Sequence, residues 1–223
     1  MKTARMLSVE EARTFYDRFG KKQDRQSFYE APALEALAAN ADLGAAHSVF
    51  ELGCGTGRYA AELLRDRLPP DATYLGVDLS ATMVGLASER LAPFGARARA
   101  ATASGDVRFP LPDASVDRVL STYVLDLLPE DRIREALSEA RRVLRPGGLA
   151  CFAGITPGTT PASRALMAAW RRLFEIKPGW LGGCRPLALA PLLGPAWRIR
   201  FHRVVVAWAV ASEVLVAAPV RAD

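Results

Sequence analysis

The chain has 223 residues, of which 50% are hydrophobic and 24% are charged, so its composition suits one globular domain with a sizeable core. Its three cysteines lack metal or disulfide spacing, no apolar run could span a bilayer, and no apolar leader follows the first residues, so we expect a cytoplasmic protein. The net charge of +5 is concentrated in residues 157–223, which carry nine Lys or Arg and three acids. This basic third is interpreted as a solvated face, or as attraction to an acidic substrate or an anionic membrane surface.

The N-terminal segment is predicted to be helical. Residues 8–19 carry apolar side chains at helical spacing, with Ser8 as a candidate cap and two acids in the first turn. A polar connection over residues 21–26 leads to a second helix over about residues 32–40.

Residues 48–58 place a short apolar strand directly before three alternate glycines, Gly53, Gly55 and Gly57. A helix is predicted to follow at once, over residues 57–67. Glycine allows positive φ and carries no Cβ, so such a loop can turn sharply and lie against a ligand. A glycine loop between strand and helix is typical of the ligand crevice of an open α/β sheet, although a tight turn without a ligand is the alternative.

Further strands and helices alternate after this loop. Asp78 ends the second predicted strand, about 20 residues after the last glycine, where a carboxylate can accept hydrogen bonds from both hydroxyls of a ribose. Ser80 is expected to cap the next helix. The predicted elements are strands 73–77, 97–103, 117–122 and 149–154 and helices 81–91 and 130–143.

The C-terminal third departs from this alternation. Residues 162–176 form an amphipathic helix that could act as a lid over a pocket, as a membrane-surface element or as a plain cover for the sheet. Residues 178–195 are rich in Gly and Pro and are predicted to form an ordered loop with a short helix at about 186–193. Strands 197–206 and 212–218 end the chain.

Five motifs follow one another along the chain: ELGCGTG at 51–57, GVDLS at 76–80 with Met83 after it, GD at 105–106, FPLPDASVDRVLS at 109–121 and RRVLRPGG at 141–148. Together they resemble the class I S-adenosylmethionine (SAM)-dependent methyltransferases, methyltransferase type 11. The most similar branch includes ubiquinone and menaquinone C-methyltransferases. The resemblance covers about residues 45–155 and implies a Rossmann-like α/β fold with a seven-stranded, mostly parallel sheet, an antiparallel C-terminal hairpin and helices on both faces.

We therefore expect a single methyltransferase domain over residues 1–223. Its predicted parts are a helical cap (1–44), a SAM-binding core (45–156), a lid-like insertion (157–196) and a C-terminal hairpin (197–223).

The resemblance also implies how SAM is held. The glycine-loop backbone meets the amino-acid portion, Glu51 acts near the amine or sulfonium, and Asp78 binds the ribose. Leu79 and Met83 pack on the adenine, whose amino group is assigned to Asp106. The expected cofactor-binding residues are Tyr16, Glu51, Gly53, Gly55, Gly57, Asp78, Leu79, Met83, Asp106, Val107 and Ser121.

The catalytic candidates are Asp126 and Tyr123, which follow the fourth predicted strand. SAM is already activated, so positioning carries most of the catalysis, and a general base is needed only for a protonated acceptor. Asp126 is interpreted as a base, a substrate contact or a helix cap. His47 is expected on the surface and His202 in a structural role, and no metal is expected.

The predicted acceptor is a small, lipophilic molecule such as a quinone-like ring or a phospholipid amine. Peripheral membrane contact is an additional prediction. Ser121-Thr122-Tyr123-Val124 stands where base-modifying enzymes carry Asn-Pro-Pro-Tyr, which argues against nucleic acid. The rival hypotheses are a non-catalytic SAM- or nucleotide-binding protein and an NAD-dependent oxidoreductase.

Overall fold

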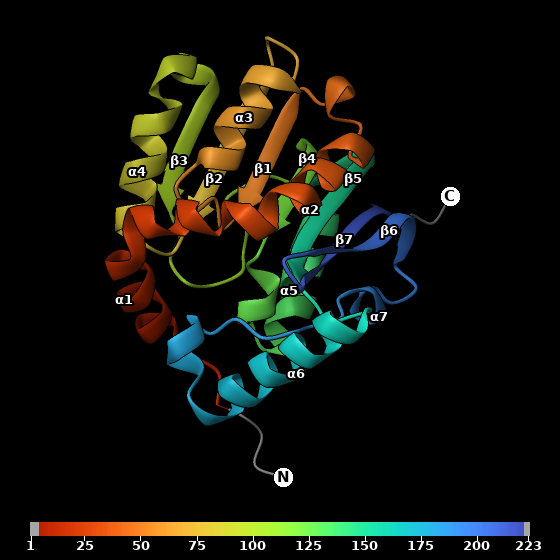
Figure 1. Cartoon of the computed structure of the whole chain (residues 1–223). Coiled ribbons are helices and arrows are strands. Elements are labelled where there is room, and N and C mark those ends of the chain that lie inside the picture. The colour runs from red at the N-terminus through yellow and green to blue at the C-terminus, as the bar shows by residue number, and fades with distance from the viewer. Residues whose placement is uncertain (1–4, 221–223) are drawn as a thin grey trace.

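A computed structural model describes residues 5–220, and one seven-stranded sheet forms its centre (Figure 1). The strand order is β3-β2-β1-β4-β5-β7-β6. The first five of these strands pair in parallel, whereas β7 is antiparallel to both β5 and β6. This topology confirms the predicted sheet with its antiparallel hairpin. The strands are β1 (Ser48–Leu52), β2 (Thr73–Asp78), β3 (Ala98–Thr102), β4 (Val116–Thr122), β5 (Leu144–Ile155), β6 (Trp197–Ala207) and β7 (Val210–Pro219).

Side chains that alternate along the strands divide the core between the two faces of the sheet. Val49 packs with helices α2, α3 and α4 on one face, whereas its neighbour Phe50 packs with α5 and α7 on the other. Helices therefore cover both faces, as predicted. The α-helices are α1 (Val9–Phe19), α2 (Ser27–Asn40), α3 (Arg58–Asp66), α4 (Ala81–Leu91), α5 (Glu130–Val143), α6 (Pro161–Ile176) and α7 (Ala190–Leu193).

Hydrogen bonds from the expected caps begin two of these helices. Ser8 forms a capping box with Glu11 at the start of α1, and the Ser80 hydroxyl accepts from the Met83 amide at the start of α4. Helix α5 begins with Glu130 and Asp131, whose charges suit the positive end of the helix dipole.

Three predicted elements differ from the structure in where they begin. Helix α2 begins at Ser27 and includes Pro32 in its second turn, and the polar connection before it is the 3₁₀ helix η1 (Gly20–Gln26). The short helix predicted over about 186–193 begins only at Ala190, and it ends at Leu193 as predicted, before Gly194 at positive φ. Strand β5 begins at Leu144, so the predicted turn at Arg145 lies inside it, beside a register irregularity opposite β4. Local propensity could not reveal the pairing of Leu144 with Val116 that begins β5 early.

Helix α1 and the segment after α6 meet beyond the carboxyl end of β2 (Figure 1). The Tyr16 hydroxyl donates to the Gly182 carbonyl oxygen at 3.4 Å. A Cβ on Gly182 would lie 2.6 Å from the Phe15 ring, so the two segments touch closely there. The 3₁₀ helix η5 (Pro178–Leu181) precedes this contact. The N-terminal helices and the Gly- and Pro-rich segment thus together cover the carboxyl end of the sheet, where the predicted site residues lie.

Candidate functional site

The glycine loop adopts the backbone that its sequence predicts. Gly53, Gly55 and Gly57 have φ values of 76°, 53° and 71°, in the region that favours glycine. A Cβ on Gly53 would lie 2.1 Å from a methyl group of Val124, and a Cβ on Gly57 would lie 2.9 Å from the Cα of Ala87. Both the conformation and the close packing therefore require glycine at these two positions.

Asp78 lies at the end of β2 beside this loop, and both of its carboxylate oxygens accept backbone hydrogen bonds. The Gly55 amide donates to Oδ2 and the Ser80 amide donates to Oδ1, each at 2.9 Å. Burial raises the pKa of Asp78 above its ordinary value, against the lowering effect of these two amides. Because each carboxylate oxygen has a second lone pair, the held side chain can still accept two hydroxyl groups.

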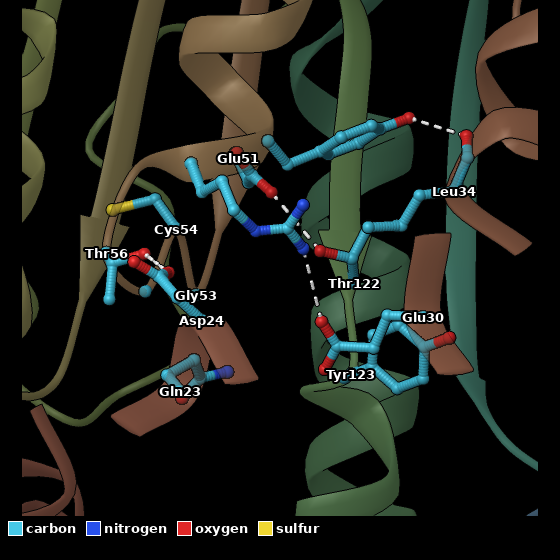
Figure 2. A pocket seen from close by; sticks show the side chains of 13 residues that line it. Gln23, Asp24, Glu30, Leu34, Glu51, Gly53, Cys54, Thr56, Thr122 and Tyr123 are labelled. Carbon is cyan, nitrogen blue, oxygen red and sulfur yellow. Dashed lines mark hydrogen bonds and ion pairs between the residues drawn. The ribbon is translucent and has the colours of Figure 1, made fainter. Parts of the chain in front are cut away.

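Glu51 lies beneath the loop, on β1, and is 1% exposed. The Tyr74 hydroxyl donates to its Oε2 at 2.5 Å and the Thr122 hydroxyl donates to its Oε1 at 3.4 Å. Burial raises the pKa of Glu51 to about 7, because a charge is poorly solvated there. The side chain nevertheless reaches the wall of a pocket (Figure 2), where its negative charge can act on a cationic group.

This pocket lies between the glycine loop and α2, and three charged residues in it were not predicted. Glu30 on α2 and Arg58 at the start of α3 form an ion pair at 3.4 Å. Asp24 on η1 accepts from the Thr56 hydroxyl at 2.6 Å, which fastens η1 to the loop. Figure 2 shows Glu30 and Glu51 approaching the pocket from different elements. The lining residues are Gln23, Asp24, Glu30, Leu34, Glu51, Gly53, Cys54, Gly55, Thr56, Arg58, Tyr59, Thr122 and Tyr123.

Only one of these three missed residues had a local signal. Arg58 follows Gly57 directly, so its place at the helix start could have been inferred from the motif. Glu30 and Asp24 reach the pocket through the packing of α2 and η1, which no spacing in the sequence specifies.

Of the two predicted tyrosines, Tyr123 lines this pocket, whereas Tyr16 lies on α1. Tyr123 has φ of 58°, and its hydroxyl donates to the Ser212 hydroxyl on β7 at 2.9 Å. Tyr16 is partly buried, and the charges of Asp78 and Asp126 both help to raise its pKa, after burial as the main cause. Tyr16 is therefore near enough to both predicted carboxylates to be affected by their charges, and its contact with the cofactor stays a prediction.

Asp126 is 2% exposed and lies on the 3₁₀ helix η4 (Leu125–Leu127) after β4. The Cys184 thiol donates to its Oδ2 at 3.2 Å, whereas Oδ1 has no hydrogen-bond partner among residues 5–220. Burial raises its pKa to about 6. Nη1 of the neighbouring Arg185 is likewise unpaired within the described chain. Asp126 also lines a second cavity, whose other walls are Glu213, Gly154 and apolar side chains of η4, β5, β7 and residues 187–189.

The remaining predicted cofactor residues differ in their surroundings. Leu79 is partly exposed beside Asp78, whereas Met83 is buried in the first turn of α4. Ser121 donates to the Leu52 carbonyl oxygen at 3.1 Å and holds β4 to the end of β1. Val107 packs in the core on the α5 face. Asp106 is exposed, and its carboxylate accepts from the Ser104 hydroxyl at 2.6 Å. The structure thus brings Glu51, Asp78 and the glycines together and leaves Asp106 at the rim.

The two histidines lie outside this site. His47 is exposed and pairs with Asp71 at 3.1 Å, and His202 pairs with the buried Glu213 at 2.7 Å. Within residues 5–220, no three His, Cys, Asp or Glu side chains group as a metal site. The helices in the same range are all too short or too polar to cross a membrane.

Comparison with known proteins matches residues 49–148 to a methyltransferase domain family. The malonyl-[acyl-carrier protein] O-methyltransferase of Marinomonas sp. (strain MWYL1) is 32% identical over 170 residues, covering 75% of this chain and 55% of that protein. The tRNA N(3)-methylcytidine methyltransferase Mettl2 of Drosophila melanogaster is 29% identical over 128 residues, covering 56% of this chain and 39% of that protein. The chain thus spans about half the length of the first relative and less of the second.

Solved structures agree with the topology. The geranyl diphosphate C-methyltransferase of Streptomyces coelicolor A3(2), in complex with Mg²⁺, geranyl diphosphate and S-adenosyl-L-homocysteine, has a TM-score of 0.63 at 15% identity. The match covers 86% of this chain and 79% of that one. The fold is the Rossmann-like class I methyltransferase fold. The matched domain and the named relatives support a SAM-dependent methyltransferase, while their names span oxygen, nitrogen and carbon acceptors and assign no accepting atom.

Proposed function

We propose that this chain transfers a methyl group from SAM to a small, lipophilic acceptor. The observation that carries the proposal is the Asp78 carboxylate, held by two backbone amides beside a glycine loop in which a Cβ would clash. This arrangement fits a ligand that combines a ribose diol with a part lying close to the loop backbone. The matched methyltransferase domain includes both features.

The chain's own residues would divide the binding of SAM among them. Asp78 accepts the ribose hydroxyls, and Leu79 and Met83 support the adenine, with Asp106 and Val107 at its edge. The glycine loop lies along the amino-acid portion, with Glu51 below it, Ser121 holding the adjacent strand and Tyr16 covering the sulfur side. When bound, SAM supplies an electrophilic methyl group on a sulfonium. The aligned loop and strand ends position the two reactants, which is where most of the catalysis arises.

The acceptor is proposed to lie on the Asp126 side, next to Tyr123. A buried carboxylate with an unpaired Oδ1 can accept a proton from a hydroxyl or amine, and its raised pKa of about 6 suits a general base at neutral pH. The cavity beside Asp126 is about 10 Å³, which is room for one water molecule at most, so the carboxylate and not the cavity is the basis of this placement. A quinol or a phospholipid amine stays the proposed type of acceptor.

Calorimetric titration with SAM, S-adenosylhomocysteine and NAD tests the cofactor assignment. We expect the two SAM-type ligands to bind and NAD not to bind. Asp78→Ala should weaken both SAM-type ligands about 100-fold, because two hydrogen bonds to a charged acceptor are lost. Asp71→Ala is the matched control, since Asp71 is an exposed acid before the same strand and, within residues 5–220, its side chain pairs with His47 alone.

Two results would contradict the proposal. Binding of NAD alone would favour an oxidoreductase, and unchanged SAM affinity in Asp78→Ala would show that the carboxylate does not hold the ribose. Once binding is established, quinols, phenols, phospholipids and tRNA can be screened for methyl incorporation. SAM binding without turnover of any of them would favour a non-catalytic binding protein, and incorporation into tRNA would contradict the small-molecule acceptor.

Peripheral membrane contact stays a separate proposal, supported by exposed apolar side chains at the end of α6 and in η5. Ile176 is 77% exposed and Trp180 is 63% exposed, near the basic residues Arg171 and Arg172. If this surface meets anionic lipid, Arg171→Glu with Arg172→Glu should weaken co-sedimentation with phosphatidylserine vesicles at low salt. Unchanged co-sedimentation would remove the membrane proposal.

A further inference from the structure

The pocket beside the glycine loop has an unequal set of charges. Three acids line it, namely Asp24, Glu30 and Glu51, and Arg58 is the one cationic residue among the described residues that line it. Asp24 is already engaged, because Arg90 and the Thr56 hydroxyl both bind its carboxylate. Glu30 and Glu51 are each at least nine-tenths buried. A ligand that carries one positive and one negative group side by side would satisfy this set.

Arg58 is available for such a ligand. It is the first residue of α3, and side chains at a helix start point back toward the N-terminus, which here is the glycine loop. Its contacts with Glu30 and Glu62, at 3.4 and 3.2 Å, are longer than the 2.7–2.9 Å typical of charge-assisted hydrogen bonds. The guanidinium therefore has donors to spare for a better acceptor, and its side chain is 23% exposed.

We infer that Arg58 binds the carboxylate of the methionine moiety of SAM, and that Glu30 holds the guanidinium when no carboxylate is there. The inference rests on the proposed function. A guanidinium presents donors in a fork that matches a carboxylate, so the ligand would replace the long contact with Glu30 by two parallel hydrogen bonds. Glu30 and Glu51 are then left facing the ammonium of the same amino acid. Arg58 is thus a specificity residue that distinguishes ligands with the carboxylate from ligands without it.

The test compares SAM with decarboxylated SAM, which keeps the sulfonium and the amine and lacks only the carboxylate. By calorimetry, Arg58→Gln should weaken SAM about tenfold to 100-fold, as expected for one charge-assisted contact. Decarboxylated SAM should change less than about threefold. Arg58→Lys should recover part of the SAM affinity, because it keeps a point charge. Arg65→Gln is the matched control, since Arg65 is exposed on the same helix and pairs with its neighbour Asp66.

A second pair of proteins separates binding from folding. Arg58→Gln leaves Glu30 buried without its cation, which could destabilise the chain. Glu30→Gln and the double variant Glu30→Gln/Arg58→Gln remove that buried charge. Compared with Glu30→Gln, the double variant should lose affinity for SAM and keep its affinity for decarboxylated SAM. Equal losses toward both ligands, or none toward either, would overturn the assignment of Arg58. Wild-type protein that binds neither ligand would overturn the proposed function itself, and this inference with it.

Discussion

Two carboxylates lie at the same end of the sheet, and the structure treats them differently. Asp78 has both oxygens bound by backbone amides of Gly55 and Ser80. Asp126 has one oxygen bound by the thiol of Cys184, and its other oxygen has no partner in the described chain. Buried polar atoms are rarely left unpaired, so an orphaned acceptor in a cavity indicates a place for a ligand or water. The Asp78 side is therefore built in advance, and the Asp126 side is completed by what binds there.

The distance along the chain explains this difference. The partners of Asp78 lie in the glycine loop and in the next turn after β2, all within one strand-loop-helix unit and its neighbour. The partner of Asp126 is 58 residues away, on the Gly- and Pro-rich segment after α6. A contact of that kind depends on the docking of a separate segment, which gives the Asp126 side more freedom to change.

The largest expected effect is from Gly53→Ala, which would disrupt the glycine loop on the Asp78 side of the site. The new Cβ would meet Val124 at 2.1 Å in a backbone with φ of 76°. We expect a loss of about 3 kcal/mol in unfolding free energy from strain and overpacking, together with loss of SAM binding. Gly85→Ala in α4 is the control, since no atom lies within 4 Å of its Cβ, and it should stabilise by about 0.5–1 kcal/mol. Equal denaturation midpoints for both variants would contradict the steric argument.

Glu51→Gln, also on the Asp78 side, should raise the stability of the fold and weaken SAM binding. The folded-state pKa of Glu51 is about 7, above its ordinary 4.5, so the folded state keeps a proton that the unfolded state releases between these values. Stability therefore falls as pH rises from about 4.5 to 7, and the variant should escape this loss. At pH 8 we expect a Tm about 5 °C or more above wild type, equal values near pH 4.5, and weaker SAM binding. A Tm difference that does not grow with pH would contradict the buried charge.

Asp126→Asn tests the side that is completed by its ligand. If Asp126 is the general base, kcat/KM should rise with pH through about 6 in the wild type, and the variant should lose about 100-fold or more in rate with a flat profile. SAM affinity should stay within about twofold, because the cofactor groups lie around Asp78. The Tm at pH 8 should rise by about 5 °C or more, since folding no longer buries this charge and the pKa rise of Asp126 is nearly as large as that of Glu51. A rate loss with an unchanged pH profile would assign Asp126 a purely structural role.

The smallest expected effect is from Asp106→Asn. The carboxylate is exposed, and within residues 5–220 it accepts one hydrogen bond, from the Ser104 hydroxyl. A hydrogen bond in water contributes little, so we expect SAM affinity to fall less than about fivefold and Tm to stay within about 1 °C. Calorimetry beside Asp78→Ala gives the contrast, and a loss as large as that of Asp78→Ala would place the adenine contact at Asp106 on an equal footing with the ribose contact.

The sequence by itself determined the sheet, most of the helices and the Asp78 side of the site. Alternation along β1, the glycines after it and Asp78 after β2 are all local patterns, and the backbone conformations that they require are fixed by sterics. The same holds for the caps at Ser8 and Ser80, whose partners lie three residues away. These features were predictable because each depends on neighbours in the chain.

Only the tertiary structure decided which charges meet in the pocket and what surrounds Asp126. Glu30 pairs with Arg58 across 28 residues, and Asp24 pairs with Arg90 across 66. Neither pair follows a helical or strand period, since each results from how η1 and α2 pack over the glycine loop. The burial that raises the pKa of Glu30 and of Asp126 has the same origin. A side chain's electrostatic environment is a property of the assembled core, because it depends on which surfaces exclude water together.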